Sequence, residues 1–276
     1  MNDTTRAATS TIETYYEILR SGADRFDPGP ASARRRWVPL RRCGARRHPV
    51  RYMLRGLRTP RPPTSDRARM TSPTSFWLIR HAVVNENARA VLYGTLDVAL
   101  CPASLIDQAP VYATLAARLP QPARWVVTPL SRTRRTAQAI FAAGYPPAEL
   151  VEEPDLIEQH LGAWQGLPHA DLPARLRLKP HAFWPLGGQE QPPGGESMAA
   201  VIERTGRAME ALAECHAGAD VVVVSHGGTI RAAVAHALGI GPDNALHLSV
   251  HNLALTRMER HRDGWRVISV NELSGS

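Results

Sequence analysis

Two histidines of this chain each follow a short run of apolar residues. Phe76–Ile79 leads directly into Arg80 and His81. Far downstream, Val221–Val224 is followed, after one serine, by His226. Short apolar runs predict buried strands, and polar residues at the end of such a strand reach a crevice at the edge of the sheet. If the two strands are neighbours, they bring two imidazoles together, where one could act as a nucleophile.

The segments that must position these histidines alternate between strand-like and helix-like patterns. We expect strands at 76–80, 125–128 and 221–224, helices at 103–119, 131–143, 196–216 and 228–238, and a closing hairpin from 253–258 and 265–270. Ser131 is expected to be an N-cap, and residues 144–194 are expected to be mostly irregular. Such alternation predicts an α/β fold, a three-layer α/β/α sandwich with a largely parallel central sheet.

The positive charge of the chain is confined to its first quarter. Residues 1–69 hold sixteen arginines and six acidic residues, whereas residues 70–276 hold seventeen basic and nineteen acidic residues. A nucleic-acid-binding role for the whole protein is therefore not expected. The arginines of residues 1–69 alternate with prolines, a composition typical of disorder. We predict a disordered extension over 1–69, a folded domain over 70–276, and Met70 as the natural start. A basic tail that binds nucleic acid or an acidic membrane, and a targeting segment, remain as alternatives for residues 1–69.

The residue types that build other kinds of site are scarce. Three scattered cysteines form no paired framework, which favours reduced thiols and a cytoplasmic location. No run reaches the roughly 18 apolar residues of a membrane span, and no secretory signal is evident. No HExxH motif or Cys/His ligand cluster is present, so neither a metal nor another cofactor is expected.

Four separated motifs carry a resemblance to a known family. They are LIRHA (Leu78–Ala82) with Asn87 after it, TPLSRTRRTA (Thr128–Ala137), LIEQHLGAWQG (Leu156–Gly166), and SHGG at 225–228 with Arg231 after it. Together, in this order, they resemble the histidine phosphatase superfamily, also called the phosphoglycerate mutase-like family. The resemblance covers about three quarters of the chain, from Phe76 onward, and lies with the phosphatase branch that includes α-ribazole phosphatase-like proteins.

The resemblance implies a role for each of six residues. His81, Glu158 and His226 would be catalytic, and Arg80, Arg132 and Asn87 would bind phosphate. Chemistry supports these roles, because phosphoryl transfer needs a nucleophile, groups that neutralise the phosphate, and a proton for the leaving oxygen. Neutral His81 would become phosphohistidine, Glu158 would supply the proton, and charged His226 would add a donor. The glycines of the Pro193–Ser197 stretch would present backbone amides to the site at a helix start.

The resemblance implies a metal-independent phosphomonoesterase of the histidine acid phosphatase type, acting on a small phosphorylated metabolite. Mutases of the family typically follow the catalytic glutamate with arginine, histidine and tyrosine, and here the sequence is Gln159, His160 and Leu161. Hydrolysis is therefore preferred over mutase activity. A mutase and a non-catalytic module that binds a phosphorylated ligand remain as alternatives. No membrane partner is expected, and the sequence leaves monomer and dimer open.

Overall fold

The structure is a computed structural model that describes residues 72–273, so the predictions for residues 1–69 and for a start at Met70 lie outside the described part. The strands are β1 (Thr74–Arg80), β2 (Arg124–Val127), β3 (Leu150–Glu152), β4 (Asp220–Ser225), β5 (Leu255–His261) and β6 (Gly264–Glu272). The α-helices are α3 (Glu86–Arg89), α4 (Pro102–Asp107), α5 (Ala109–Arg118), α6 (Ser131–Ala142), α7 (Met198–Cys215), α8 (Gly227–Leu238) and α9 (Pro242–Ala245). Four short 3-10 helices, η1 to η4, are Pro154–Leu156, Gly162–Trp164, His169–Asp171 and Pro173–Arg175.

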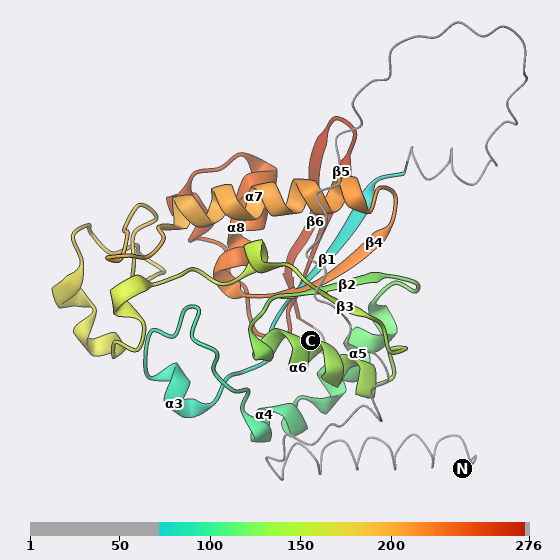
Figure 1. Ribbon diagram of the computed structural model, residues 1–276, viewed down its shortest axis with the longest axis horizontal. Coiled ribbons are helices and arrows are strands. Elements are labelled where there is room, and N and C mark those ends of the chain that lie inside the picture. The colour runs from blue at the N-terminus through green and yellow to red at the C-terminus, as the bar shows by residue number, and fades with distance from the viewer. Residues whose placement is uncertain (1–71, 274–276) are drawn as a thin grey trace, which may run out of the picture.

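The strands form one sheet in the order β3-β2-β4-β1-β5-β6. β1 to β4 pair in parallel, and the closing hairpin of β5 and β6 is antiparallel. Helices cover both faces, with α7 and α8 on one and α5 and α6 on the other (Figure 1). The predicted three-layer sandwich with a largely parallel sheet is therefore confirmed.

Alternation along the strands explains why both faces need helices. Phe76 and Leu78 of β1 pack with α7 and α8, whereas Ile79 packs with α5 and α6. The valines of β4 divide in the same way, and all four are at most 1% exposed. A parallel strand that is buried on both faces reads as a continuous apolar run, which is the pattern that marked these strands in the sequence.

Two local expectations were wrong. Residues 103–119 form two helices, because Pro110 lacks an N–H and fits only a first turn, where it opens α5. Ser131 is the first residue of α6 rather than its N-cap, and its backbone N–H and hydroxyl both donate to the Asp97 carboxylate at 2.8 Å. The region 144–194 is mostly irregular, as expected, apart from the short edge strand β3 and the four 3-10 helices.

Candidate active site

The two histidines meet where β1 and β4 end side by side. Arg80 is in register with Ser225, and the backbone N–H of His81 donates to the Ser225 carbonyl at 2.9 Å. The imidazole centroids of His81 and His226 lie 5.3 Å apart. The Asn252 side chain also donates to the His81 carbonyl at 2.8 Å. The strands thus juxtapose the two rings as the sequence predicted.

The surroundings of His81 suit a nucleophile. Its side chain is buried, and Nδ1 lies 2.7 Å from the Ala82 carbonyl, to which it can only donate. Nδ1 therefore carries the proton and Nε2 keeps its lone pair. Burial lowers the pKa of His81 well below its usual value, and the charges of Arg132 and Arg80 lower it further. The imidazole is therefore neutral near pH 7, the form that can attack phosphorus.

His226 is buried beside it but uses both ring nitrogens. Nε2 lies 2.9 Å from the Thr128 hydroxyl, and the Nε of Arg132 donates to Nδ1 at 3.3 Å. Since Nδ1 accepts, the proton of the neutral ring lies on Nε2. Burial, followed by the charge of Arg132, lowers the pKa of His226 well below its usual value. The charged donor expected of His226 in a phosphate complex stays a prediction.

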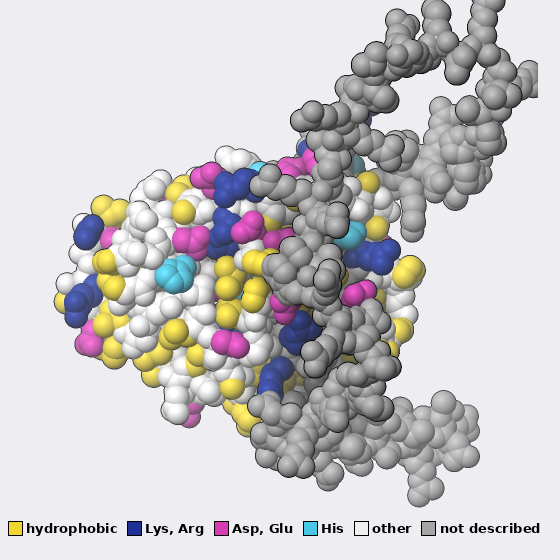
Figure 2. Space-filling view, in the orientation of Figure 1, with side chains coloured by type: hydrophobic (Ala, Val, Ile, Leu, Met, Phe, Trp, Pro, Cys, Tyr) yellow, Lys and Arg dark blue, Asp and Glu magenta, His cyan; other side chains and the backbone are white. Residues whose placement is uncertain are grey.

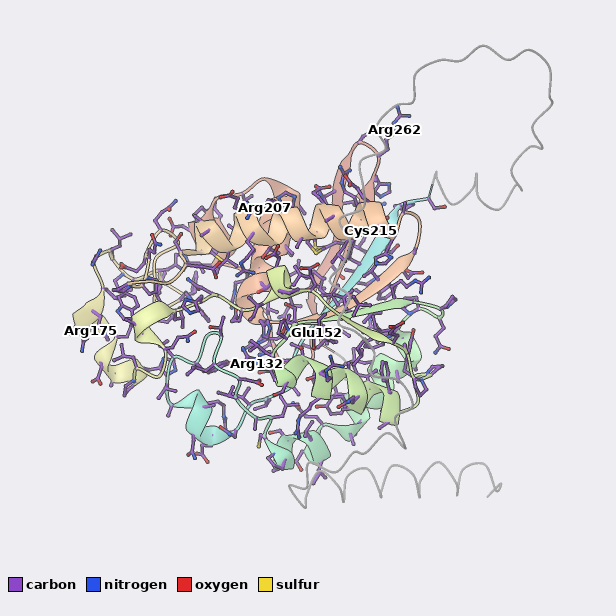
Figure 3. The ribbon with its side chains drawn as sticks, in the orientation of Figure 1. Arg132, Glu152, Arg175, Arg207, Cys215 and Arg262 are labelled. Carbon is purple, nitrogen blue, oxygen red and sulfur yellow. The ribbon has the colours of Figure 1, made fainter. Side chains whose placement is uncertain are left out.

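Arg132 is fully buried at the start of α6, among the loops at the C-terminal ends of the strands (Figure 3). Its two terminal nitrogens donate to the carbonyls of Gly94 and Leu96, at 2.8 and 2.7 Å. Asp97 ties this loop to the beginning of α6 through Ser131. One loop therefore fixes the guanidinium of Arg132, which is held 3.3 Å from the ring of His226.

Arg80 lies at the end of β1, and one terminal nitrogen donates to the Val250 carbonyl at 2.6 Å. Its Nε is buried without a hydrogen-bond partner. A buried unpaired donor is costly, so this one is available to an incoming anion. Gly227, the first residue of α8, lies directly against this group, because a Cβ there would be 3.3 Å from the Arg80 Nε.

Glu158 reaches the same place from the loop after η1. Its carboxylate accepts from the backbone N–H of Gln159 at 2.9 Å and of Gly228 at 3.2 Å. A Cβ on Gly228 would be 2.3 Å from a carboxylate oxygen of Glu158, so only glycine permits this approach. Gln159 is turned away and donates to the Glu196 carbonyl at 2.7 Å.

Five of the six predicted site residues therefore gather at this edge of the sheet, and no hydrogen bond joins the Asn87 side chain to them in the described residues. Asn87 is exposed in α3, and its side chain makes no hydrogen bond in the described part of the chain. Its phosphate contact stays a prediction.

Two backbone amides of the Pro193–Ser197 stretch are bonded within the chain and are not free for a ligand. The N–H of Gly195 donates to the Pro192 carbonyl and that of Glu196 to the His160 carbonyl, at 2.8 and 2.7 Å. Gly195 also lets two backbones touch, since a Cβ there would be 2.6 Å from the His160 carbonyl oxygen. The expected contact of the other amides with the site stays a prediction.

The sequence gave no separate role to Arg231, although it closes the fourth motif. Arg231 lies on α8, is 7% exposed, and stacks on the Trp184 ring, with its central carbon 4.5 Å from the ring centroid. Its stacking partner Trp184 lies far from it in the sequence, so no local pattern revealed this contact. The only signal available was its place after the SHGG motif.

Other kinds of site have little support in residues 72–273. No group of three or more His, Cys, Asp or Glu side chains there could hold a metal ion. No helix in that range is long and apolar enough to cross a membrane. Basic and acidic side chains are interspersed on the face drawn in Figure 2, so no patch of one sign dominates the described surface there.

Solved structures resemble this fold closely. A mycobacterial glucosyl-3-phosphoglycerate phosphatase superposes with a TM-score of 0.59 and 26% identity. The match covers 72% of this chain and 99% of the phosphatase chain. A protein described as mycobacterial hydrolase 1 gives a TM-score of 0.60 and 26% identity, covering 73% of this chain and 99% of its own.

Sequence relatives agree. A metal-independent phosphoserine phosphatase of Arabidopsis thaliana is 32% identical over 160 residues, which is 58% of this chain and 66%, just under two thirds, of the relative. A glucosyl-3-phosphoglycerate phosphatase of Mycolicibacterium vanbaalenii is 32% identical over 179 residues, which is 60% of this chain and 75% of the relative. Residues 76–273 match the histidine phosphatase superfamily, branch 1. The chain belongs to the histidine phosphatase superfamily.

Proposed function

We propose that this protein hydrolyses phosphomonoesters of small metabolites through a phosphohistidine intermediate. The observation that carries the proposal is the hydrogen bonding of His81, whose Nδ1 is bound to the Ala82 carbonyl while Nε2 has no partner in the described residues. Two relatives are phosphatases by name, one for phosphoserine and one for glucosyl-3-phosphoglycerate. Their names support hydrolysis here as well.

In the first step, Nε2 of His81 attacks phosphorus and the bond to the ester oxygen breaks. Arg80 and Arg132 neutralise the phosphate oxygens, which suits the planar, multidentate guanidinium. The leaving oxygen takes a proton from Glu158, which must enter this step protonated. The products are an alcohol, phosphohistidine at His81 and a Glu158 carboxylate.

In the second step, the Glu158 carboxylate takes a proton from water as the water oxygen attacks phosphorus. The bond from phosphorus to Nε2 breaks, inorganic phosphate forms, and His81 returns to its neutral state. Glu158 is then protonated for the next turnover. The Gly228 N–H, which donates to this carboxylate, keeps it oriented in both steps.

We extend the proposal to metal-independent turnover of the histidine acid phosphatase type. Two arginines and an ordered carboxylate already supply the charge neutralisation and the proton transfer of the scheme above. A cytoplasmic location, a small-molecule substrate and a monomer or dimer complete the proposal.

The test is phosphate release by the full chain, with chelator present, from p-nitrophenyl phosphate, phosphosugars, nucleotides and phosphoglycerates. The same assay is run on His81→Ala. We expect release by the wild type, none by the variant, and acid-labile labelling of the wild type alone.

Release by His81→Ala at the wild-type rate would overturn the phosphohistidine scheme. Isomer formation from 3-phosphoglycerate without phosphate release would instead assign a mutase. Tight binding of the same compounds without turnover would assign a non-catalytic binding module.

A further inference from the structure

Arg231 is a buried cation that the scheme above does not use. Its Nε donates to the Leu248 carbonyl at 2.8 Å, and its central guanidinium carbon lies over the Trp184 ring, 4.5 Å from the centroid. Its two terminal nitrogens donate to no group in the described part of the chain, and no carboxylate there forms an ion pair with it. Burial lowers its pKa, the nearby Glu158 carboxylate opposes that effect, and the charge of Arg80 adds to it. Cations are rarely left buried without a partner.

The guanidinium of Arg231 opens toward the phosphate pocket. A Cβ on Gly227 would be 3.5 Å from the terminal nitrogen Nη1 of Arg231 and 3.4 Å from the central guanidinium carbon of Arg80. The two guanidinium groups therefore flank the same glycine, immediately after His226. A phosphoester held at Arg80 would have the rest of its structure within reach of Arg231.

Trp184 and the backbone hold Arg231 in this position. Trp184 packs against the apolar side chains of Met198, Val201 and Leu246 and against the neighbouring cluster around Trp164. An arginine that is stacked on a fixed ring and bonded through Nε presents its terminal nitrogens as a rigid fork. That geometry matches the two oxygens of a carboxylate.

Protonation of Glu158 leaves Arg231 without its counter-charge. The Glu158 carboxylate is the anionic group that acts on Arg231 and raises its pKa. The first step of the scheme requires Glu158 to be protonated, and Arg231 then has no anion beside it in the described part of the chain. A carboxylate of the substrate would take that place.

We infer that Arg231, stacked on Trp184, binds a carboxylate of the substrate, so that the preferred substrates are phosphomonoesters that also carry a carboxylate. The inference rests on the proposed phosphatase function and names its substrate class. A charge-assisted hydrogen bond contributes about 1.5–3 kcal/mol, which corresponds to a roughly 10- to 100-fold preference.

The experiment compares two substrates that differ only in this group, 3-phosphoglycerate and glycerol 3-phosphate, which has a hydroxymethyl group in place of the carboxylate. The readout is the ratio of their kcat/KM values in the full-length wild type, Arg231→Gln and Arg231→Lys. The control is Arg175→Gln, which removes the charge of an exposed arginine placed well away from Arg132 in Figure 3.

We expect the wild type and Arg175→Gln to prefer 3-phosphoglycerate by roughly 10- to 100-fold. Arg231→Gln should lose that preference, and Arg231→Lys should keep part of it. Inhibition by inorganic phosphate in each variant reports whether the phosphate pocket is intact. Equal kcat/KM values in the wild type, or a full preference in Arg231→Gln, would overturn the inference.

Calorimetry separates this inference from the proposed function. If no compound is hydrolysed, the phosphatase proposal fails, but the binding constants of the same two compounds still test Arg231. Tighter binding of 3-phosphoglycerate that is lost in Arg231→Gln would uphold the carboxylate site. Equal binding of both compounds would overturn it.

Discussion

His81 and His226 are both buried and both have a lowered pKa, yet their hydrogen bonds give them different capacities. His81 uses Nδ1 alone, on a backbone carbonyl, so Nε2 keeps a lone pair. In His226, Nε2 is hydrogen-bonded to the Thr128 hydroxyl and Nδ1 accepts from Arg132. The first ring can form a bond to phosphorus, whereas the second holds Arg132 in place. The residue types alone gave no means of separating these roles.

Replacing Glu158 with glutamine tests its role in proton transfer. Glu158→Gln keeps the size of the side chain and an acceptor for the Gly228 N–H, but it can neither give nor take the required proton. We expect kcat to fall by roughly 10²- to 10⁴-fold while inhibition by inorganic phosphate changes little.

The control for this substitution is Glu152→Gln, at an exposed carboxylate of β3 that pairs with Arg134. It makes the same chemical change away from the site and should turn over like the wild type. A Glu158→Gln enzyme with wild-type kcat would remove Glu158 from the mechanism.

Gly228 tests how closely Glu158 must be positioned. In Gly228→Ala the new methyl carbon would stand 2.3 Å from the carboxylate, so the carboxylate must move. A displacement of about 1 Å in a catalytic group can cost on the order of 10²-fold in rate. We expect kcat/KM to fall by about that factor in a folded protein. Gly241→Ala is the matched control, because Gly241 has a φ of −71° and open space around its Cβ position.

At the scale of elements, strands and helices with a local residue pattern were predicted from the sequence. Contacts between residues far apart in the chain were missed. The apolar runs of β1 and β4 located the two histidines, because a strand buried on both faces has a composition of its own. Asp97 escaped notice as the partner of the first residue of α6, since it lies 34 residues before Ser131. The three residues of β3 carry too little pattern to distinguish them from a loop.

The loop that holds Arg132 makes a prediction at this scale. Asp97→Ala removes both hydrogen bonds to Ser131, whose N–H is one of the unpaired groups at a helix start. Loss of such a capping interaction costs about 1 kcal/mol. The substitution also loosens the loop whose Gly94 and Leu96 carbonyls hold Arg132. We expect a lower free energy of unfolding in urea and a raised KM, with kcat less affected.

Ser131→Ala separates the two bonds, because it removes the hydroxyl and keeps the backbone N–H. Ser131→Ala should change both the free energy of unfolding and KM less than Asp97→Ala does. If Ser131→Ala and Asp97→Ala lowered the free energy of unfolding equally, the hydroxyl bond would account for the whole effect. The backbone hydrogen bond to Asp97 would then not be the stabilising one.

At the scale of the whole molecule, the site joins segments from most of the chain, and this arrangement was only partly predictable. The family motifs identified Arg80, Arg132, Glu158 and the two histidines, which the fold brings together. The stacking of Arg231 on Trp184 depends on how the 181–184 segment lies over α8. That placement follows from tertiary packing rather than from any local pattern.

Folding the chain around two neutral imidazoles couples its stability to pH. Burial lowers the pKa of His81 and of His226, and it also lowers that of His216. Below the ordinary histidine pKa of about 6.5, the unfolded chain binds protons that the folded chain does not. The free energy of unfolding therefore falls as the pH drops through this range, by up to about 1.4 kcal/mol per pH unit for each group.

Urea denaturation between pH 8 and pH 5.5, in buffer without phosphate, measures this slope. The raised pKa of the half-buried Glu153 acts in the opposite direction, but it does so in the wild type and the variant alike and therefore cancels in their comparison. His81→Ala should reduce the slope by close to one proton. A slope that is identical in the wild type and His81→Ala would contradict a lowered pKa of His81 in the folded enzyme.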